Sequence, residues 1–178
     1  DRLHEVLQLA MGWTNSHLHS FRFAGAEYTN AREELDELKM LPVRGQTLAS
    51  VLGATEQEFH YLYDWGDGWD HRVVIEHIGK PREGWSYPLC TGGAHACPPE
   101  DVGGTGGYEE FLEAIRHPRH EEHERYLIWA GGVFDPEGFD VNWEEHAKVI
   151  GSYTSLDKAR AWFEQAVAAA RAKAASCS

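Results

Sequence analysis

Apolar and polar residues alternate along two neighbouring runs of the chain, residues 59–65 and 71–78. A period of two is typical of β-strands that bury one face, and aromatic residues fill most of the apolar positions in the first run. The segment between the runs contains Gly66, Asp67 and Gly68, residue types that suit a tight turn. The pattern therefore predicts an antiparallel hairpin.

A weaker alternation lies between Trp13 and Thr29, where residues 17, 19, 21 and 23 share one parity. Ala24 and Gly25 interrupt it and predict a turn, followed by a partner strand over residues 26–29. We therefore expect a second hairpin near the start of the chain.

Elsewhere the apolar residues recur every three to four positions, which predicts amphipathic helices. The predicted helices cover residues 3–10, 31–38, 47–52, 108–117, 121–130 and 143–150, and a long Ala-rich helix follows from about residue 154. Residues 79–107 are rich in glycine and proline, which predicts a long irregular connection. We expect an α+β fold with an antiparallel sheet built from hairpins and packed with several helices. Residues 1–150 would form a single domain, and residues 151–178 a C-terminal helical extension.

Composition excludes several classes of function. The 178 residues carry a formal charge of −13, so direct binding to nucleic acid is not expected. No apolar run approaches the roughly 18 residues that span a bilayer, and no signal sequence opens the chain. Three cysteines form no secreted disulfide framework, which favours the cytoplasm. The chain starts at Asp1 rather than Met, so further sequence upstream is expected.

Candidate chemistry gathers first at the tip of the stronger hairpin, which contains Asp64, Asp67, Asp70 and His71. A hairpin can bring carboxylates on either side of its turn near one imidazole. Such a group can ligate a cation or orient a histidine base. The same residues could instead hydrogen-bond the turn and have only a structural role.

Two cysteines extend this candidate site. Cys90 and Cys97 are separated by six residues, a looser spacing than a zinc knuckle uses. Together with Asp64 and His71 they give a candidate set of metal ligands, with zinc as the preferred ion. A pair of reduced, buried thiols is the alternative.

A second acidic group follows two prolines. Glu100 and Asp101 come directly after Pro98 and Pro99, whose stiffness would fix the direction of the carboxylates. With Asp67 and His71 they form the candidate catalytic set, although acidic residues here could also cap the next helix. The chain has no phosphate-binding loop, dinucleotide-binding fingerprint, serine-hydrolase elbow or zinc-protease motif.

Five ordered motifs resemble those of the plasmid Ri open-reading-frame-three family, whose members are also known as TnpR-like passenger proteins of insertion sequences. The motifs are Leu3–Trp13, Ser16–Phe21, Tyr63–His71, Ala96–Asp101 and Phe134–Asp140. The resemblance covers residues 2–149 and implies an α+β domain with an antiparallel sheet. It implies no established activity.

The chain differs from the family pattern at two places. Members usually begin with an additional strand pair, which this chain lacks before its first helix. They also commonly have a third cysteine at the position of Val102, so a three-thiolate metal site is not expected here.

Two functional hypotheses remain open. In the first, the hairpin tip and the Pro-Pro-Glu-Asp loop form a ligand- or metal-binding site that supports hydrolysis. Asp67 or His71 would act as the base, and Glu100 or Asp101 would help to hold a divalent cation. In the second, the chain is a non-enzymatic accessory or regulatory protein of a mobile element that acts through protein contacts. The first hypothesis requires the hairpin tip and the loop to meet.

Overall fold

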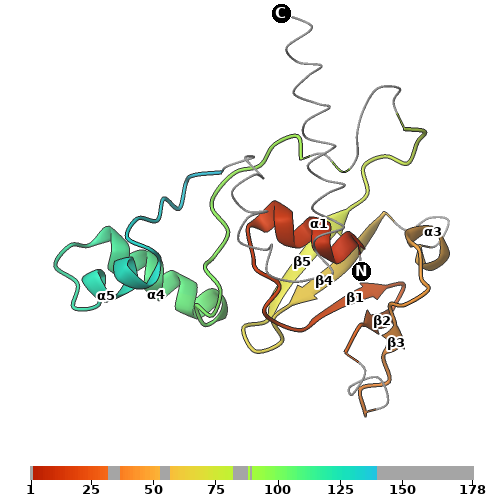
Figure 1. The fold of residues 1–178 in the computed structure, drawn as a ribbon, viewed down its shortest axis with the longest axis horizontal. Helices are drawn as coiled ribbons and strands as arrows, with labels where there is room; N and C mark the ends of the chain where they lie inside the picture. Colours follow the sequence, from red (N-terminus) through yellow and green to blue (C-terminus); the bar gives the residue numbers. More distant parts are fainter. Residues whose placement is uncertain (1, 32–36, 53–56, 82–87, 89, 140–178) are drawn as a thin grey trace, which may run out of the picture. The chain divides into compact units, whose positions relative to one another are not determined.

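The computed structural model describes residues 2–31, 37–52, 57–81, 88 and 90–139 (Figure 1). These residues belong to two compact units whose segments alternate along the chain. The first unit takes its described residues from 16–78 and 101–126, and the second takes its described residues from 2–15, 79–100 and 127–139. The predicted helix at 143–150, the Ala-rich C-terminal helix and most of the predicted helix at 31–38 lie outside the described residues. The domain boundaries proposed from the sequence stay a prediction.

The first unit contains a five-stranded sheet with the strand order β3-β2-β1-β4-β5 (Figure 1). The strands are β1 (His19–Phe23), β2 (Ala26–Thr29), β3 (Leu41–Pro42), β4 (Glu58–Tyr63) and β5 (Trp69–Val74). All neighbouring pairs are antiparallel except β2 and β3. The α+β class and both predicted hairpins are confirmed. The short edge strand β3 was not predicted, because two residues that include a proline show no alternation.

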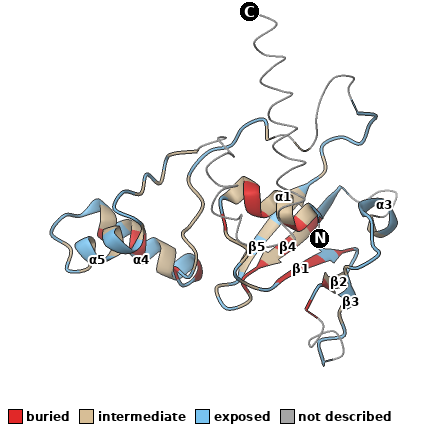
Figure 2. Ribbon diagram, in the orientation of Figure 1, coloured by how far each residue is buried: buried red, intermediate tan, exposed pale blue. Residues whose placement is uncertain are grey.

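The two hairpins are joined through β1 and β4, which pair with His19 opposite Tyr63. This long-range pairing gives the sheet one aromatic face. Phe21, Phe23 and Phe59 are each at most 5% exposed, and the rings of Phe23 and Phe59 are 4.6 Å apart. Figure 2 shows the buried residues concentrated along β1. Cross-strand aromatic pairs of this kind contribute much of the stability of a sheet.

Helix α4 (Gly104–Arg116) packs through Phe111 and Ala114, which have no exposed surface. It begins at Gly104, four residues before the predicted start at residue 108, so the prediction of irregular chain up to residue 107 is wrong at this end. Glycine is needed there for close packing, because a Cβ atom at Gly107 would overlap the carbonyl of Val102.

Two shorter helices agree with the sequence pattern. Helix α3 (Leu48–Val51) begins with a capping box between Thr47 and Ser50. Helix α5 (His123–Trp129) follows α4, and His123 Nδ1 lies 2.9 Å from the carbonyl oxygen of Ala114. The predicted helices at 47–52 and 121–130 are therefore confirmed, with shorter bounds.

The second unit starts with the predicted helix α1 (Arg2–Met11). Trp13 follows this helix, is only 2% exposed, and donates from Nε1 to the carbonyl of Pro98 at 2.8 Å. That bond fixes the Pro-Pro segment against the end of α1. No helix among the described residues is long and apolar enough to cross a membrane.

Candidate metal centre

Asp64 directly follows strand β4 and has its side chain aimed inward. Its backbone has a left-handed conformation, with φ of 50°, which aspartate tolerates better than most residues. The backbone N–H of Asp64 donates to Leu18 at 2.9 Å, and Oδ1 accepts from the N–H groups of Gly66 and Asp67 at 3.0 and 3.3 Å. These bonds hold a carboxylate whose side chain is only 9% exposed. Its second oxygen, Oδ2, faces His17.

The imidazole of His17 lies between two carboxylates. Nδ1 is 3.6 Å from Oδ2 of Asp64, and Nε2 is 3.2 Å from Oδ1 of Asp101. The ring packs edge-on against Tyr63, with centroids 5.9 Å apart, and the side chain is 25% exposed. His17 directly precedes the β1 region, so the pairing of β1 with β4 places it beside the end of β4.

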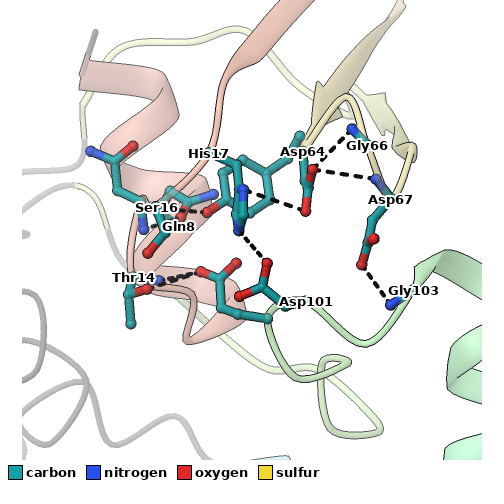
Figure 3. Close-up of polar contacts among 12 residues, drawn as sticks. Gln8, Thr14, Ser16, His17, Asp64, Gly66, Asp67, Asp101 and Gly103 are labelled. Carbon is teal, nitrogen blue, oxygen red and sulfur yellow. Dashed lines mark hydrogen bonds and ion pairs between the residues drawn. The ribbon is translucent and has the colours of Figure 1, made fainter.

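Asp101 reaches His17 from the Pro-Pro-Glu-Asp loop. Its backbone is also left-handed, with φ of 59°, and its side chain is 70% exposed. The segment that follows Asp101 is attached to the hairpin tip by a hydrogen bond of 2.9 Å from the Gly103 N–H to Oδ2 of Asp67. Figure 3 shows Asp64 and Asp101 both directed at the His17 ring. The hairpin tip therefore meets Asp101 and Gly103, which belong to the same unit.

We refer to His17, Asp64 and Asp101 as the His17 cluster. One ligating atom from each side chain lies within 4.8 Å of the other two. Ligands about 2.1 Å from a common ion are about 3.0 to 3.5 Å apart, so the three side chains would have to move together by up to about 1.5 Å to share a cation. Two oxygens and one nitrogen give a donor set that suits a divalent transition metal.

Comparison with known proteins places the chain in a family. The model of the family described as plasmid pRiA4b ORF-3-like protein matches residues 1–143. The chain belongs to this family. It is 42% identical over 149 residues to the uncharacterized protein y4hQ of Sinorhizobium fredii (strain NBRC 101917 / NGR234), a match that covers 84% of this chain and 76% of y4hQ.

A solved structure is also similar to this pRiA4b ORF-3-like chain. The crystal structure of protein MM3350 from Methanosarcina mazei Go1, described as a protein of unknown function, superposes with a TM-score of 0.69 at 36% identity. The match covers 78% of each chain. Family and fold are thus shown, and the names of these relatives state no activity. The function of this family member has to be argued from its own residues.

His71 was proposed as both a ligand and a base. It lies on β5 opposite Tyr61, and its Nδ1 is 3.1 Å from the Tyr61 carbonyl oxygen. Burial lowers the pKa of His71, against smaller raising contributions from the backbone of Tyr61 and Trp69. The group of ligating atoms that forms around Asp64 contains His17 and Asp101 and does not contain His71.

Two of the proposed acids have hydrogen-bonding partners. Asp67 accepts from Gly103, as described above, and so holds the segment that follows Asp101 on the hairpin. Glu100 belongs to the second unit, where its Oε1 accepts from the backbone N–H and the hydroxyl of Thr14 at 2.8 and 3.1 Å. Of the proposed catalytic set, Asp101 lies in the His17 cluster. The catalytic roles proposed for all four residues stay predictions.

The two cysteines proposed as metal ligands belong to the second unit. Cys90 Sγ is 3.6 Å from the carbonyl oxygen of Gly92, and both thiols are free of disulfides. Burial raises the pKa of Cys97 to about 12, and the charge of Glu100 adds to this effect. A thiol of this kind is a poor source of thiolate at neutral pH. A ligand set that includes these thiols stays a prediction.

Sequence patterns did not single out His17 as a site residue. The alternation over residues 17–23 placed it on a strand face together with Phe21, and this pattern gave it no chemical role. Its position beside Asp64 depends on the pairing of β1 with β4, which are distant in the sequence. To find His17 from the sequence, one would have had to predict that the first hairpin pairs with the second through β1 and β4.

Proposed function

We propose that this pRiA4b ORF-3-like domain binds a divalent transition-metal ion through the His17 cluster, with zinc as the preferred ion. The observation that carries the proposal is the convergence of three ligating side chains from three separate segments. His17 precedes β1, Asp64 follows β4, and Asp101 precedes α4.

The donor set favours transition metals over calcium and magnesium. Calcium takes six to eight oxygen ligands and magnesium keeps an octahedral oxygen shell, whereas imidazole suits zinc and related ions. The anchoring of Asp64 supports this view, because its Oδ1 is held by two backbone N–H groups while Oδ2 faces His17. Such bonds to a ligating carboxylate orient it toward an ion.

The exposure of Asp101 also supports a hydrolytic role. Three protein ligands leave a zinc ion at least one open position, and Asp101 lies at the solvent-exposed side of the cluster. A zinc ion held by these three side chains would supply Lewis-acid activation of water, the chemistry that hydrolyses esters, amides and phosphoesters. The proposed reaction class is therefore metal-assisted hydrolysis.

The same geometry also suits a purely structural role. His17, which lies between the Asp64 and Asp101 carboxylates, would then join the hairpin tip to Asp101 without any ion. The two explanations differ in one measurable property, because only a metal site gains stability when an ion is added.

Isothermal titration of the chelator-treated full chain with zinc and manganese tests the proposal. Wild-type protein should bind one ion per chain, and at a free concentration 100 times Kd its free energy of unfolding should rise by about 2.7 kcal/mol. Asp101→Asn should weaken binding at least tenfold without unfolding the domain, because this side chain is 70% exposed. Glu109→Gln, an exposed carboxylate on α4, is the matched control and should leave binding unchanged.

Two results would contradict the proposal. The first is that neither zinc nor manganese binds or stabilises the wild-type chain. The second is that Asp101→Asn and His17→Gln bind the ions as well as the wild type does. If zinc binds at the cluster but the loaded protein hydrolyses no ester or phosphoester faster than Asp101→Asn, only the hydrolytic role is excluded.

A second candidate function is that of a non-enzymatic accessory or regulatory protein of a mobile element. The TnpR-like name used for some members of the resembled family motivates it. Exposed apolar side chains favour protein contacts, since Ile128 and Val133 are 78% and 86% exposed. Replacing both by serine should then abolish a partner complex and leave metal binding intact. Loss of metal binding with an unchanged partner complex would contradict this candidate.

A further inference from the structure

Strand β5 is an edge strand of the sheet, and its backbone has an alternating hydrogen-bonding pattern. The Ile75 N–H donates to Gln57 at 2.6 Å, so the odd-numbered residues of β5 face β4. The even-numbered residues Asp70, Arg72 and Val74 therefore direct their N–H and C=O groups away from β4. Among the described residues, no strand pairs with this side of β5.

The side chains along this edge are exposed and carry charges of opposite sign. Asp70 and Arg72 have side chains 46% and 63% exposed, and both lie on the face of the sheet opposite Phe21. Within the chain they belong to surface ion pairs, Asp70 with His60 and Arg22, and Arg72 with Glu58. Surface pairs of this kind contribute little and can be shared or exchanged.

This charge pattern is self-complementary in one antiparallel register. If two copies of β5 pair around a two-fold axis at His71, residue 70 of each copy lies opposite residue 72 of the other. Residues 70 and 72 both have outward N–H and C=O groups, so the same register also forms backbone hydrogen bonds between the two copies. Opposite charges directly across a strand pair are favourable, and like charges are unfavourable.

We propose that the chain forms a homodimer through antiparallel pairing of β5 with β5 of a second copy, in the register that places Asp70 opposite Arg72. The interface is isologous, so each contact occurs twice. It joins the two five-stranded sheets into one continuous sheet and removes an edge that would otherwise promote aggregation.

Sedimentation velocity of the full chain under reducing conditions, over a range of concentrations, tests the proposal. The wild type should show a monomer–dimer equilibrium. Asp70→Arg and Arg72→Asp should each raise the dimer Kd by about tenfold, because each places like charges opposite one another. An equimolar mixture of the two variants should restore the dimer, since the heterodimer again pairs opposite charges. Arg44 lies at an exposed loop position away from β5. Arg44→Asp makes the same charge change as Arg72→Asp and should leave the dimer Kd at its wild-type value.

Amide hydrogen exchange of the wild type provides a test that needs no variant. The outward amides of Asp70 and Arg72 should exchange more slowly as the protein concentration rises. A wild type that stays monomeric at all concentrations overturns the proposal. So does a dimer in which both single variants retain the wild-type Kd, or in which the two amides show no dependence on concentration.

Discussion

Asp67 Oδ2 accepts a hydrogen bond of 2.9 Å from the backbone N–H of Gly103, although 36 positions separate the two residues. The bond attaches the segment between Asp101 and α4 to the tip of the β4–β5 hairpin. It also places Asp101, two residues before Gly103, within reach of His17. The geometry of the His17 cluster therefore depends on a residue that is not itself part of it.

Removing this bond should weaken both the fold and the metal site. Asp67→Ala should lower the free energy of unfolding by about 1 to 2 kcal/mol, because a charge-assisted hydrogen bond is lost at a partly exposed position. Zinc affinity should fall as well, since Asp101 is held less firmly. Asp67→Asn keeps an oxygen acceptor and should lose less than half as much stability. Chemical denaturation and zinc titration of the two variants measure both effects, and equal losses in Ala and Asn would contradict the role of the bond.

Glycine substitutions at the start of α4 should have opposite effects at neighbouring positions. Gly104 has φ of 68°, and a Cβ atom there would lie 2.5 Å from the carbonyl oxygen of Asp67. Gly104→Ala should therefore destabilise the chain by about 2 kcal/mol or more. A Cβ atom at Gly106 meets nothing within 4 Å, so Gly106→Ala should stabilise the helix by about 0.5 to 1 kcal/mol. Thermal unfolding of both variants measures these changes in stability. A Gly106→Ala variant less stable than the wild type would contradict the prediction.

His4 should make stability depend on pH in the acidic range. It is 4% exposed and its Nε2 lies 2.6 Å from Asn15 Oδ1, and burial lowers its pKa from 6.5 to about 4. Between these pH values the unfolded chain binds a proton that the folded chain does not, so stability is full above pH 6.5 and falls toward pH 4. The loss should be about 3 kcal/mol in total, with little further contribution from His4 below pH 4.

His4→Gln isolates this contribution, because glutamine retains an amide donor but has no proton to gain. Urea denaturation at several pH values should show a steeper acid loss in the wild type than in the variant. Parallel profiles for the two proteins would show that His4 does not cause the pH dependence.

Cys97 should resist thiol reagents while the chain is folded. With its pKa raised from 9.0 to about 12, its thiolate fraction at pH 8 should be roughly a thousandfold below that of the unfolded chain. Iodoacetamide labelling followed by peptide mass spectrometry, with and without denaturant, measures this ratio at Cys97 itself. Rapid labelling of Cys97 in the folded chain would contradict the burial of its thiol.

Much of the local structure could be predicted from the sequence. The alternation over residues 59–65 and 71–78, together with the turn at 66–68, determined the β4–β5 hairpin because a period of two allows few other structures. The start of α4 was placed too late. Three glycines opposed a helix by propensity, and only packing against Asp67 and Val102 shows why two of them, Gly104 and Gly107, are needed.

For the candidate metal centre too, part could be predicted from the sequence and part depended on the tertiary structure. By itself, the sequence identified the acidic hairpin tip and the Pro-Pro-Glu-Asp loop as separate groups of polar residues, because residue type and spacing are local properties. Only the tertiary structure decided that His17 joins them, since this depends on the pairing of β1 with β4 and on the bond between Asp67 and Gly103. Both contacts link segments distant in the sequence. Burial of the aromatic face stabilises the strand pairing and a hydrogen bond holds Gly103 at Asp67, but no local pattern encodes which segments meet.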